Sequence, residues 1–332
     1  MTDPEQTVSY EELAELEDEF ESIDVEIMRK QYELSKTAYA KRAQAVAKIE
    51  NFWPLVFEQC GPEIDAFISP QDSQLINAHL VDFQVSRPEL DTKGTDGNPR
   101  TLRVTFTFSE NPYFEEKVLE KTFYYRRASD DWTGLVSEPV KITWKKGKDL
   151  TEGMSEMVWK LWEARRKAGD MRSKTVPEYA ALEKKMESVT DSSFFNWFGW
   201  VSNRRYVSAE ESDKATKAYQ AKKAKKAKGE EVAEKGEEED DVSDEYDQTV
   251  EVHPDGESLA YSLVEELWPG AIRLFMQAQQ DDEELSEADF EDFDDEEDGE
   301  DEPVDIRALV GKGRGRGSTG SAAAPPTKKQ KK

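Results

Sequence analysis

A long amphipathic helix is the first element that the order of apolar and polar residues predicts. No Gly or Pro occurs between residues 10 and 53, and Pro54 then forbids a regular continuation. Apolar residues recur there at alternating steps of three and four, which places them in stripes on a helix. One stripe consists of Leu13, Leu16, Phe20, Ile23, Ile27 and Leu34. A second stripe consists of Val25, Met28, Tyr32, Tyr39, Val46, Ile49 and Trp53.

The length of this helix predicts self-association. About 40 helical residues span on the order of 60 Å, which is longer than a small domain is wide. No second helix of matching length is visible in the sequence, so pairing with a second copy is favoured over an intramolecular hairpin, which stays the alternative. We therefore predict that residues 10–53 form a dimerisation helix. Its interface is assigned to Leu13, Leu16, Phe20, Ile23, Ile27, Leu34, Met28, Tyr32 and Tyr39.

The next part of the chain changes from helical spacing to alternation, which is typical of strands. Apolar residues alternate with polar ones in four segments, 81–85, 102–108, 118–126 and 140–144. Short polar turns separate these segments, so we predict an antiparallel meander with one apolar face. A short helical stretch at 55–67 precedes these segments, and later helical patterns that could cover the face occur at 157–168, 179–189, 193–201 and 258–278. Strands followed by helices predict an α+β fold.

Charge changes the picture of the termini. The chain holds 45 Lys and Arg against 73 Asp and Glu, a formal net charge of −28 over 332 residues. Residues 281–306 contain 17 acids and no bases, residues 230–247 carry −10, and residues 307–332 contain eight bases and no acids. Blocks of like charge cannot bury a core and are expected to be disordered.

These shifts in composition predict the organisation of the chain. A lobe of α+β structure covers 54–207 and ends with a helix over 253–280. The other predicted segments are a disordered N-terminus (1–9), a largely disordered Lys-rich and acidic insertion (208–252), an acidic disordered tail (281–306) and a basic tail (307–332). Seven Lys lie among Ala in 214–228, which suits a helix. This stretch could be an import signal, a DNA contact, a partner of the neighbouring acids, or only a solvated extension.

Catalytic and metal chemistry is poorly supplied. Cys60 is the one cysteine, and His79 and His253 are the two histidines. We therefore predict no enzyme activity, no cofactor and no metal site, and no apolar run long enough to cross a membrane is present. The acidic N-terminus, which has no apolar core, argues against a secretory signal. An acidic chain of this kind is expected to bind basic partners.

Five ordered motifs resemble the signature segments of the nucleosome assembly protein family, in its SET (template-activating factor I) branch. They are AKRAQAVAKIENFWPLVF (40–57), FTFSENPYFEEKVLEKTF (106–123), ITWKKGKDLT (142–151), SFFNWF (193–198) and EELWPGAIRLF (265–275). The resemblance covers about residues 10–280. It departs from the family at Glu50, where proline is usual, and in longer segments at 152–192 and 198–257. The resemblance implies a homodimer with a headphone-like shape that acts as a histone chaperone.

The resemblance also implies a histone-binding surface on the underside of the lobe. Asn196 matches a polar residue of the aromatic motif, Asp255 and Glu257 fall near an acidic pair that opens the last helix, and Glu265 and Glu266 match an acidic pair before Trp-Pro. For Asp255, capping of a helix is an equal alternative.

The acidic tail is the second predicted histone contact. A flexible polyanion competes with DNA phosphates for Lys and Arg surfaces. Phe290 and Phe293, with Asp289 beside them, are expected to insert into a partner as anchors. The alternative is a tail that only solubilises the chain.

The basic tail predicts a nuclear protein, with shuttling to the cytoplasm left open. The import signal is assigned to Lys328, Lys329, Lys331 and Lys332. The Gly-Arg run before it suits weak or indirect contact with nucleic acid. The predicted function is therefore a histone chaperone that shields core histones and promotes nucleosome assembly and disassembly. The alternative is an acidic scaffold that regulates a chromatin-modifying enzyme, as a phosphatase inhibitor or acetyltransferase partner.

Overall fold

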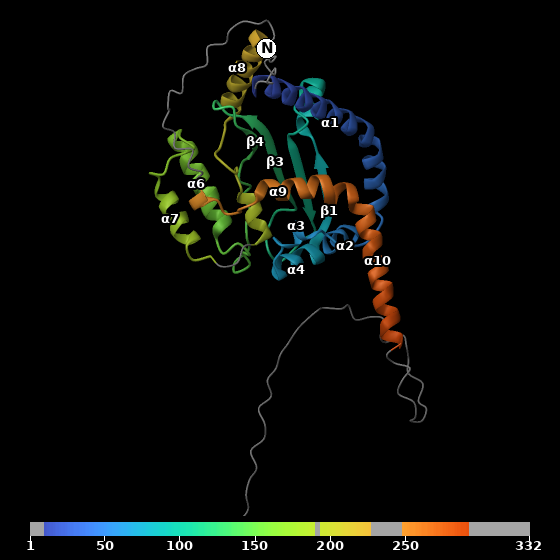
Figure 1. Ribbon diagram of the computed structural model, residues 1–332. Helices are drawn as coiled ribbons and strands as arrows, with labels where there is room; N and C mark the ends of the chain where they lie inside the picture. The colour runs from blue at the N-terminus through green and yellow to red at the C-terminus, as the bar shows by residue number, and fades with distance from the viewer. Residues whose placement is uncertain (1–9, 190–192, 227–247, 292–332) are drawn as a thin grey trace, which may run out of the picture. The chain divides into compact units, whose positions relative to one another are not determined.

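The computed structural model describes residues 10–189, 193–226 and 248–291 (Figure 1). Two units divide the chain, Met1–Glu283 and Glu284–Lys332, and the fold described below is that of the first. Its order is a long helix, a four-stranded sheet with short helices before and after β1, and then further helices. The α+β class predicted from the sequence is confirmed.

Helix α1 (Tyr10–Val46) is shorter than predicted. The chain leaves the helix after Val46, and Asn51 adopts a left-handed conformation with φ 56°. Helix α2 (Phe52–Glu58) then begins, with Pro54 inside its first turn. Proline is tolerated there because the first N–H groups of a helix have no intrahelical acceptor. The turn allows Phe52 and Trp53 to be buried, so the prediction that one helix continues to residue 53 was wrong.

The sheet consists of β1 (Leu80–Ser86), β2 (Leu102–Phe108), β3 (Val118–Arg127) and β4 (Thr133–Ser137), paired antiparallel in that order. Register is set by pairs such as Phe106 with Leu119 and Phe123 with Ser137. The meander is confirmed, but its fourth strand was predicted at 140–144. That segment forms only an isolated bridge, between Phe114 and Trp144.

A register shift between Leu80 and Asp82 changes which residues of β1 point to the core. Val81 is exposed as a result, whereas Phe83 is fully buried. A bulge inserts one residue, and every side chain before it changes face because the strand period is two. The predicted alternation of Val81, Phe83 and Val85 on one buried face therefore holds only from Phe83 onward.

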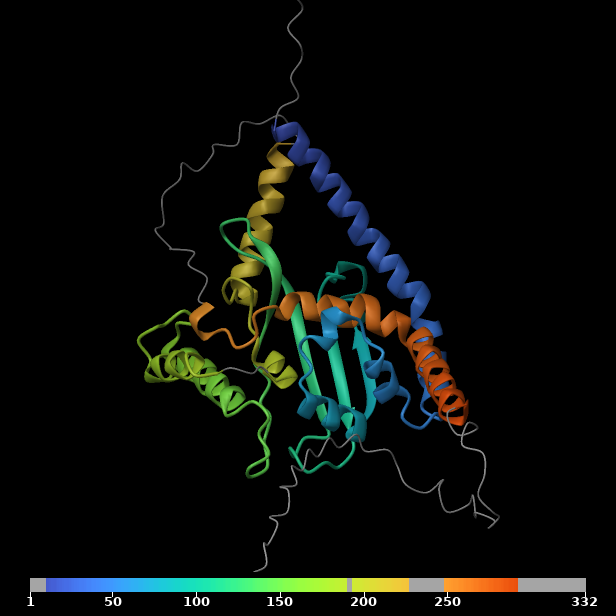
Figure 2. The ribbon, with the colours of Figure 1, turned by 60° about the horizontal axis from the view of Figure 1, so that its bottom comes forward.

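The core lies between the apolar face of the sheet and the helices that cover it. Phe83, Phe106 and Phe123 of the sheet face α2, the 3-10 helix η2 (Phe194–Gly199) and the last helices. Figure 2 shows these last helices crossing the strands. They are α9 (Gly256–Tyr261), the π turn η4 (Ser262–Leu267) and α10 (Trp268–Glu291).

The remaining elements complete the lobe. Helices α6 and α7 enclose a second, smaller cluster with Val250 and Val252. The elements not yet given are α3 (Pro62–Asp65), α4 (Pro70–His79), α5 (Pro88–Lys93), η1 (Gly94–Asp96), α6 (Met154–Ala168), α7 (Pro177–Met186), α8 (Ala209–Lys226) and η3 (Gln248–Val250).

Two predicted boundaries of disorder differ from the structure. Residues 209–226 of the insertion form the helix α8, because Ala and Lys favour helix and its inner side contacts β3. Helix α10 continues to Glu291, beyond the predicted end at 280. The predictions for 1–9, 227–247 and 292–332 lie outside the described residues.

Candidate functional site

The first candidate surface is the outer side of α9, η4 and α10. Glu265 and Glu266 are both exposed in the π turn, between the buried residues Val264 and Leu267. A π turn inserts one residue into a helix and is frequent at functional sites. Tyr261, Ile272 and Met276 are exposed on the same helices, so carboxylates and apolar side chains are both offered to solvent.

The two carboxylates of the π turn differ in their partners. Glu265 Oε1 accepts a hydrogen bond from Arg87 Nη2 at 2.8 Å, in an ion pair whose Glu side chain is 46% exposed and whose Arg side chain is 12% exposed. Among the described residues, Glu266 forms no ion pair or hydrogen bond through its side chain. Glu266 is therefore the carboxylate of this pair that is ready to receive a cation.

The two acids at the N-terminus of α9, Asp255 and Glu257, also differ in their hydrogen-bond partners. Asp255 occupies the N-cap position, but its side chain accepts no capping hydrogen bond and is exposed. Glu257 accepts hydrogen bonds from Leu135 N at 3.3 Å and Asn203 Nδ2 at 2.6 Å. Burial, and to a smaller extent the charge of Asp255, raises the pKa of Glu257. Glu257 therefore ties α9 to β4, and Asp255 is the one available to a partner.

Asn196 does not lie on this surface. It is 2% exposed within η2, where all six residues are buried, and its Oδ1 has no hydrogen-bond partner among the described residues. The aromatic side chains on both sides of Asn196 pack into the core, and Asn196 is therefore buried with them. The structure does not support the prediction that Asn196 contacts histones directly.

The predicted sites in the tails are only partly described. The backbone of Asp289 and Phe290 belongs to the last turns of α10, and their side chains lie outside the described part of the chain. Phe293 and the import-signal lysines Lys328, Lys329, Lys331 and Lys332 also lie outside it.

The second candidate surface is the outward stripe of α1. Leu13, Leu16, Phe20, Ile23, Ile27 and Leu34 are all at least half exposed, up to 71% for Leu34. Isolated apolar side chains are common on protein surfaces, but a continuous row of six large ones is not. Such rows mark interaction surfaces. This stripe is the part of the predicted interface that is available to a second chain.

The other stripe of α1 contacts the lobe of its own chain. Tyr32 Oη donates to Asp91 Oδ2 at 2.9 Å, and the Tyr39 ring lies 5.4 Å from the Trp268 ring. Arg42 is buried, stacks 4.0 Å from Trp268 and donates to its carbonyl oxygen. Tyr32, Tyr39 and Met28 are half-buried on this side, so their place in a dimer interface stays a prediction.

A buried polar cluster beside the first surface is absent from the sites predicted from the sequence. Lys121 is fully buried, and its Nζ donates to the carbonyl oxygens of Trp200, Phe198 and Glu138 at 2.8–3.2 Å. Glu251 accepts hydrogen bonds from the N–H groups of Val201 and His253. Burial lowers the pKa of Lys121 to about 7 and raises that of Glu251 to about 8.

His253 belongs to the same cluster. It is 1% exposed, packs 4.7 Å from the Phe67 ring, and neither ring nitrogen has a partner among the described residues. Burial lowers its pKa from 6.5 to about 4; the nearby charge of Asp255 opposes this shift and that of Lys121 adds to it. The prediction left His253 outside any base or metal site, and the structure gives it a place in the core.

We expect His253 to make the fold sensitive to acid. Because folding holds the ring neutral, the unfolded chain binds the proton first between pH 6.5 and 4, and stability is lost as pH falls through this window. A pKa of about 4 corresponds to roughly 3 kcal/mol of unfolding free energy lost by pH 4. Urea unfolding at pH 7 and pH 4 should show a smaller difference in His253→Leu than in the parent.

The partly exposed His79 supplies the control for this measurement. His79→Gln should leave the pH dependence of stability close to that of the parent. His79 is only partly buried, and this partial burial is the cause of its lowered pKa. The same pH dependence in His253→Leu as in the parent would contradict the assignment.

The described ranges offer little nucleophilic or metal-binding chemistry. Burial raises the pKa of the Cys60 thiol to about 12, so it is a poor nucleophile. Within residues 10–189, 193–226 and 248–291, no group of three His, Cys, Asp or Glu side chains is arranged to hold a metal ion. In those same ranges no helix is both long and apolar enough to cross a membrane.

Comparison with known proteins identifies one family. The family model of the nucleosome assembly protein (NAP) matches residues 4–278. A putative nucleosome assembly protein of Schizosaccharomyces pombe is 35% identical over 152 residues, which are 43% of this chain and 59% of that protein. The human protein SETSIP is 27% identical over 201 residues, 58% of this chain and 57% of that protein. The chain thus matches less than two thirds of the length of either relative.

The solved structure of Ccp1 is 27% identical, covers 81% of this chain and 95% of its own, and has a TM-score of 0.47.

Proposed function

Since the chain belongs to the nucleosome assembly protein family, we propose that it is a histone chaperone. It binds basic core histones, shields them from non-specific contacts with DNA, and promotes nucleosome assembly and disassembly. The action is electrostatic rather than catalytic. It needs only to compete with non-specific histone–DNA contacts, which are weaker than those of a specific complex.

The feature that carries this proposal is the acidic face of the last helices together with its continuation. Asp255 and Glu266 are exposed and unpaired within the described residues. In the sequence, the 281–306 block with its 17 acids follows these helices. Lys and Arg of a histone would meet fixed carboxylates on the lobe and a dense polyanion beyond it. Asp289, Phe290 and Phe293 are proposed as contacts in that second region.

The protein acts as a homodimer in this proposal. The outward stripe of α1 is apolar and uncovered, while the inner side of the helix is already occupied by the lobe. Burying the stripe against the same stripe of a second copy removes six large apolar side chains of each copy from water. The basic end of the chain suits a nuclear location, with the four lysines near residue 330 as the import signal.

Deleting residues 292–332 is expected to weaken histone binding. The cut removes ten of the tail acids but leaves α10 intact. Fewer carboxylates displace fewer counterions, so both affinity and its dependence on salt should fall. Fluorescence titration of each labelled core histone pair between about 100 and 300 mM salt measures both quantities, with about a tenfold loss expected at the lower concentration.

The matched control deletes only 307–332, which removes eight bases and no acids. That variant should bind histones at least as tightly as the parent, because repulsion between like charges is reduced. If the longer deletion binds as the shorter one does, the acidic tail has no role. If the full chain fails to bind either histone pair at the lower salt concentration, the proposed function is wrong.

A further inference from the structure

Helix α8 carries four of its six lysines on the side that faces away from the lobe. The helix contains six Lys, while its three acids, Glu210, Glu211 and Asp213, are confined to its N-terminal end. Lys214, Lys217, Lys222 and Lys225 are exposed, and within the described residues none of them forms an ion pair. At 100° per residue these four positions fall within about 140° of arc, so they form one face.

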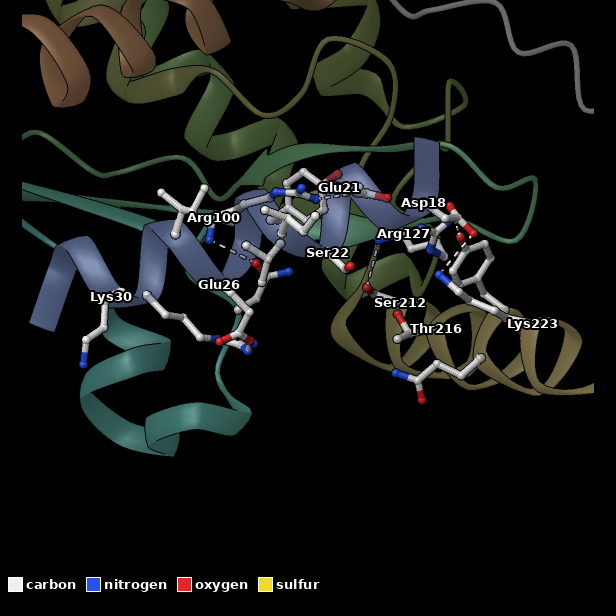
Figure 3. A pocket seen from close by; sticks show the side chains of 18 residues that line it. Asp18, Glu21, Ser22, Glu26, Lys30, Arg100, Arg127, Ser212, Thr216 and Lys223 are labelled. Atoms are coloured by element: carbon white, nitrogen blue, oxygen red, sulfur yellow. Dashed lines mark hydrogen bonds and ion pairs between the residues drawn. The ribbon is translucent and has the colours of Figure 1, made fainter. Parts of the chain in front are cut away.

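The inner side of α8 is firmly attached. Ser212 Oγ accepts a hydrogen bond from Arg127 N at 3.0 Å, and the Arg127 guanidinium lies 3.8 Å from the Tyr219 ring centre. Asp18 of α1 accepts from Tyr219 Oη at 2.5 Å and pairs with Lys223 at 3.3 Å. Figure 3 shows Asp18, Arg127, Ser212 and Lys223 meeting between α1, α8 and the sheet.

These contacts decide which way the lysines point. Ser212, Tyr219 and Lys223 share one side of the helix, and a groove of about 840 Å³ lies on that side, between α8, α1 and Arg100. The four exposed lysines lie on average about 150° from this side. The Lys face is therefore held outward on a rigid support and is not part of the groove.

The four exposed lysines, Lys214, Lys217, Lys222 and Lys225, form the Lys face and repel one another, so an anionic partner would stabilise it. Like charges three or four residues apart on a helix destabilise it by a few tenths of a kcal/mol per pair. A helix that served only as a brace for α1 would be more stable with acids among its lysines. After Asp213 no acid occurs up to Lys226, so the outer face is uniformly positive in a chain of net charge −28.

We propose that this Lys face binds the phosphate backbone of double-stranded DNA without reading its sequence. Lysine ammonium groups act as point charges and suit phosphates contacted one at a time. From Lys214 to Lys225 the row spans about 16 Å, which matches a few successive phosphates along a duplex. The chain would then hold histones on its acidic surfaces and DNA on α8, a contact that goes beyond histone binding and does not require it.

The test uses the full chain and a labelled duplex of about 25 base pairs with no histone present. Anisotropy is measured from about 50 to 200 mM salt for the parent and for a variant in which the four lysines become Gln, namely Lys214→Gln, Lys217→Gln, Lys222→Gln and Lys225→Gln. Affinity at the lowest salt concentration should fall by about tenfold or more, and the slope of log K against log salt should decrease by about 3.

The control removes four exposed lysines elsewhere on the surface, with the same change in net charge. These are Lys41→Gln, Lys48→Gln, Lys141→Gln and Lys146→Gln. Gln and Lys favour helix about equally, and circular dichroism of both variants checks that α8 is retained. The control should keep the parent's affinity and salt slope.

Two results would overturn the proposal. In the first, the α8 variant and the control bind the duplex equally, which assigns any DNA contact to another basic segment such as 307–332. In the second, the full chain does not bind the duplex at the lowest salt concentration, which indicates that its own acidic segment 230–247 satisfies the Lys face. Neither result bears on histone binding, which is measured without DNA.

Discussion

A protein carrying Ile23→Glu and Ile27→Glu is expected to sediment as a monomer at concentrations where the parent sediments as a dimer. Both side chains are about half exposed in the single chain, at 52% and 57%, and lie on the outward stripe of α1. In a paired stripe each would be enclosed by apolar neighbours. Placing a carboxylate there costs several kcal/mol unless it is paired, so we expect dimerisation to weaken by more than about a hundredfold.

Sedimentation velocity over a range of concentrations measures this effect directly. The control, Ala40→Glu with Gln44→Glu, adds two acids to exposed positions of α1 that lie off the outward stripe. It should remain dimeric. A stripe variant that keeps the parent's sedimentation coefficient would show that another surface joins the two copies, or that the parent is itself a monomer.

Replacing Lys121 by Met is expected to lower the free energy of unfolding by about 1–3 kcal/mol. The ammonium group is fully buried and donates to three carbonyl oxygens from two segments. Its loss removes one hydrogen bond from each, although the Phe198 and Trp200 carbonyls still accept from Val140 N and Ser137 Oγ. It also removes the positive charge that partly offsets the raised pKa of Glu251. Urea unfolding followed by circular dichroism measures the change.

A second substitution separates the polar cluster from simple packing. Glu251→Gln keeps the shape of the side chain and removes its ionisable carboxyl group, so the double variant with Lys121→Met should lose less than the sum of the two single variants. Lys117→Met, at an exposed position just before β3, is the control and should change the unfolding free energy by no more than about 0.5 kcal/mol. A loss below about 1 kcal/mol for Lys121→Met would contradict this account.

Lys121 shows both the reach and the limit of sequence patterns. The alternation in 118–126 places it between Leu119 and Phe123 on the apolar face of the strand, and all three are buried. That pattern was visible in the sequence, and a lysine in such a position signals a buried polar cluster. Its acceptors could not be found, since they belong to segments about 17 and 80 residues further along the chain.

The strands were predictable where one face alone is buried. β2 follows the predicted range of 102–108 because its apolar and polar residues alternate strictly. β4 was missed because four of its five residues are buried, so no alternation marks it. Residues 140–144 alternate without forming a strand, since Val140 N donates to the Phe198 carbonyl of η2 instead of to a neighbouring strand.

The candidate surfaces were predictable to a similar degree. Stripes on α1 follow from spacing, but the sequence could not show that the lobe covers the stripe with Tyr32 and Tyr39 and leaves the one with Ile23 open. Likewise the acids of the last helix were found as a group. Burial distinguishes Glu257, which holds β4, from Asp255, which is exposed, and this distinction depends on contacts between distant parts of the chain.

The π turn at Ser262–Leu267 sets the rotational phase between α9 and α10. An α-helix advances 100° per residue, so the extra residue turns everything after it by that angle relative to a regular helix. Because of this turn, Trp268 is stacked on Trp53 at 5.6 Å and against Arg42. Losing one residue from this turn would rotate Trp268 out of that stack while leaving the composition of the helix almost unchanged. The alignment of α1 with the last helix thus depends on a count of residues as much as on their kinds.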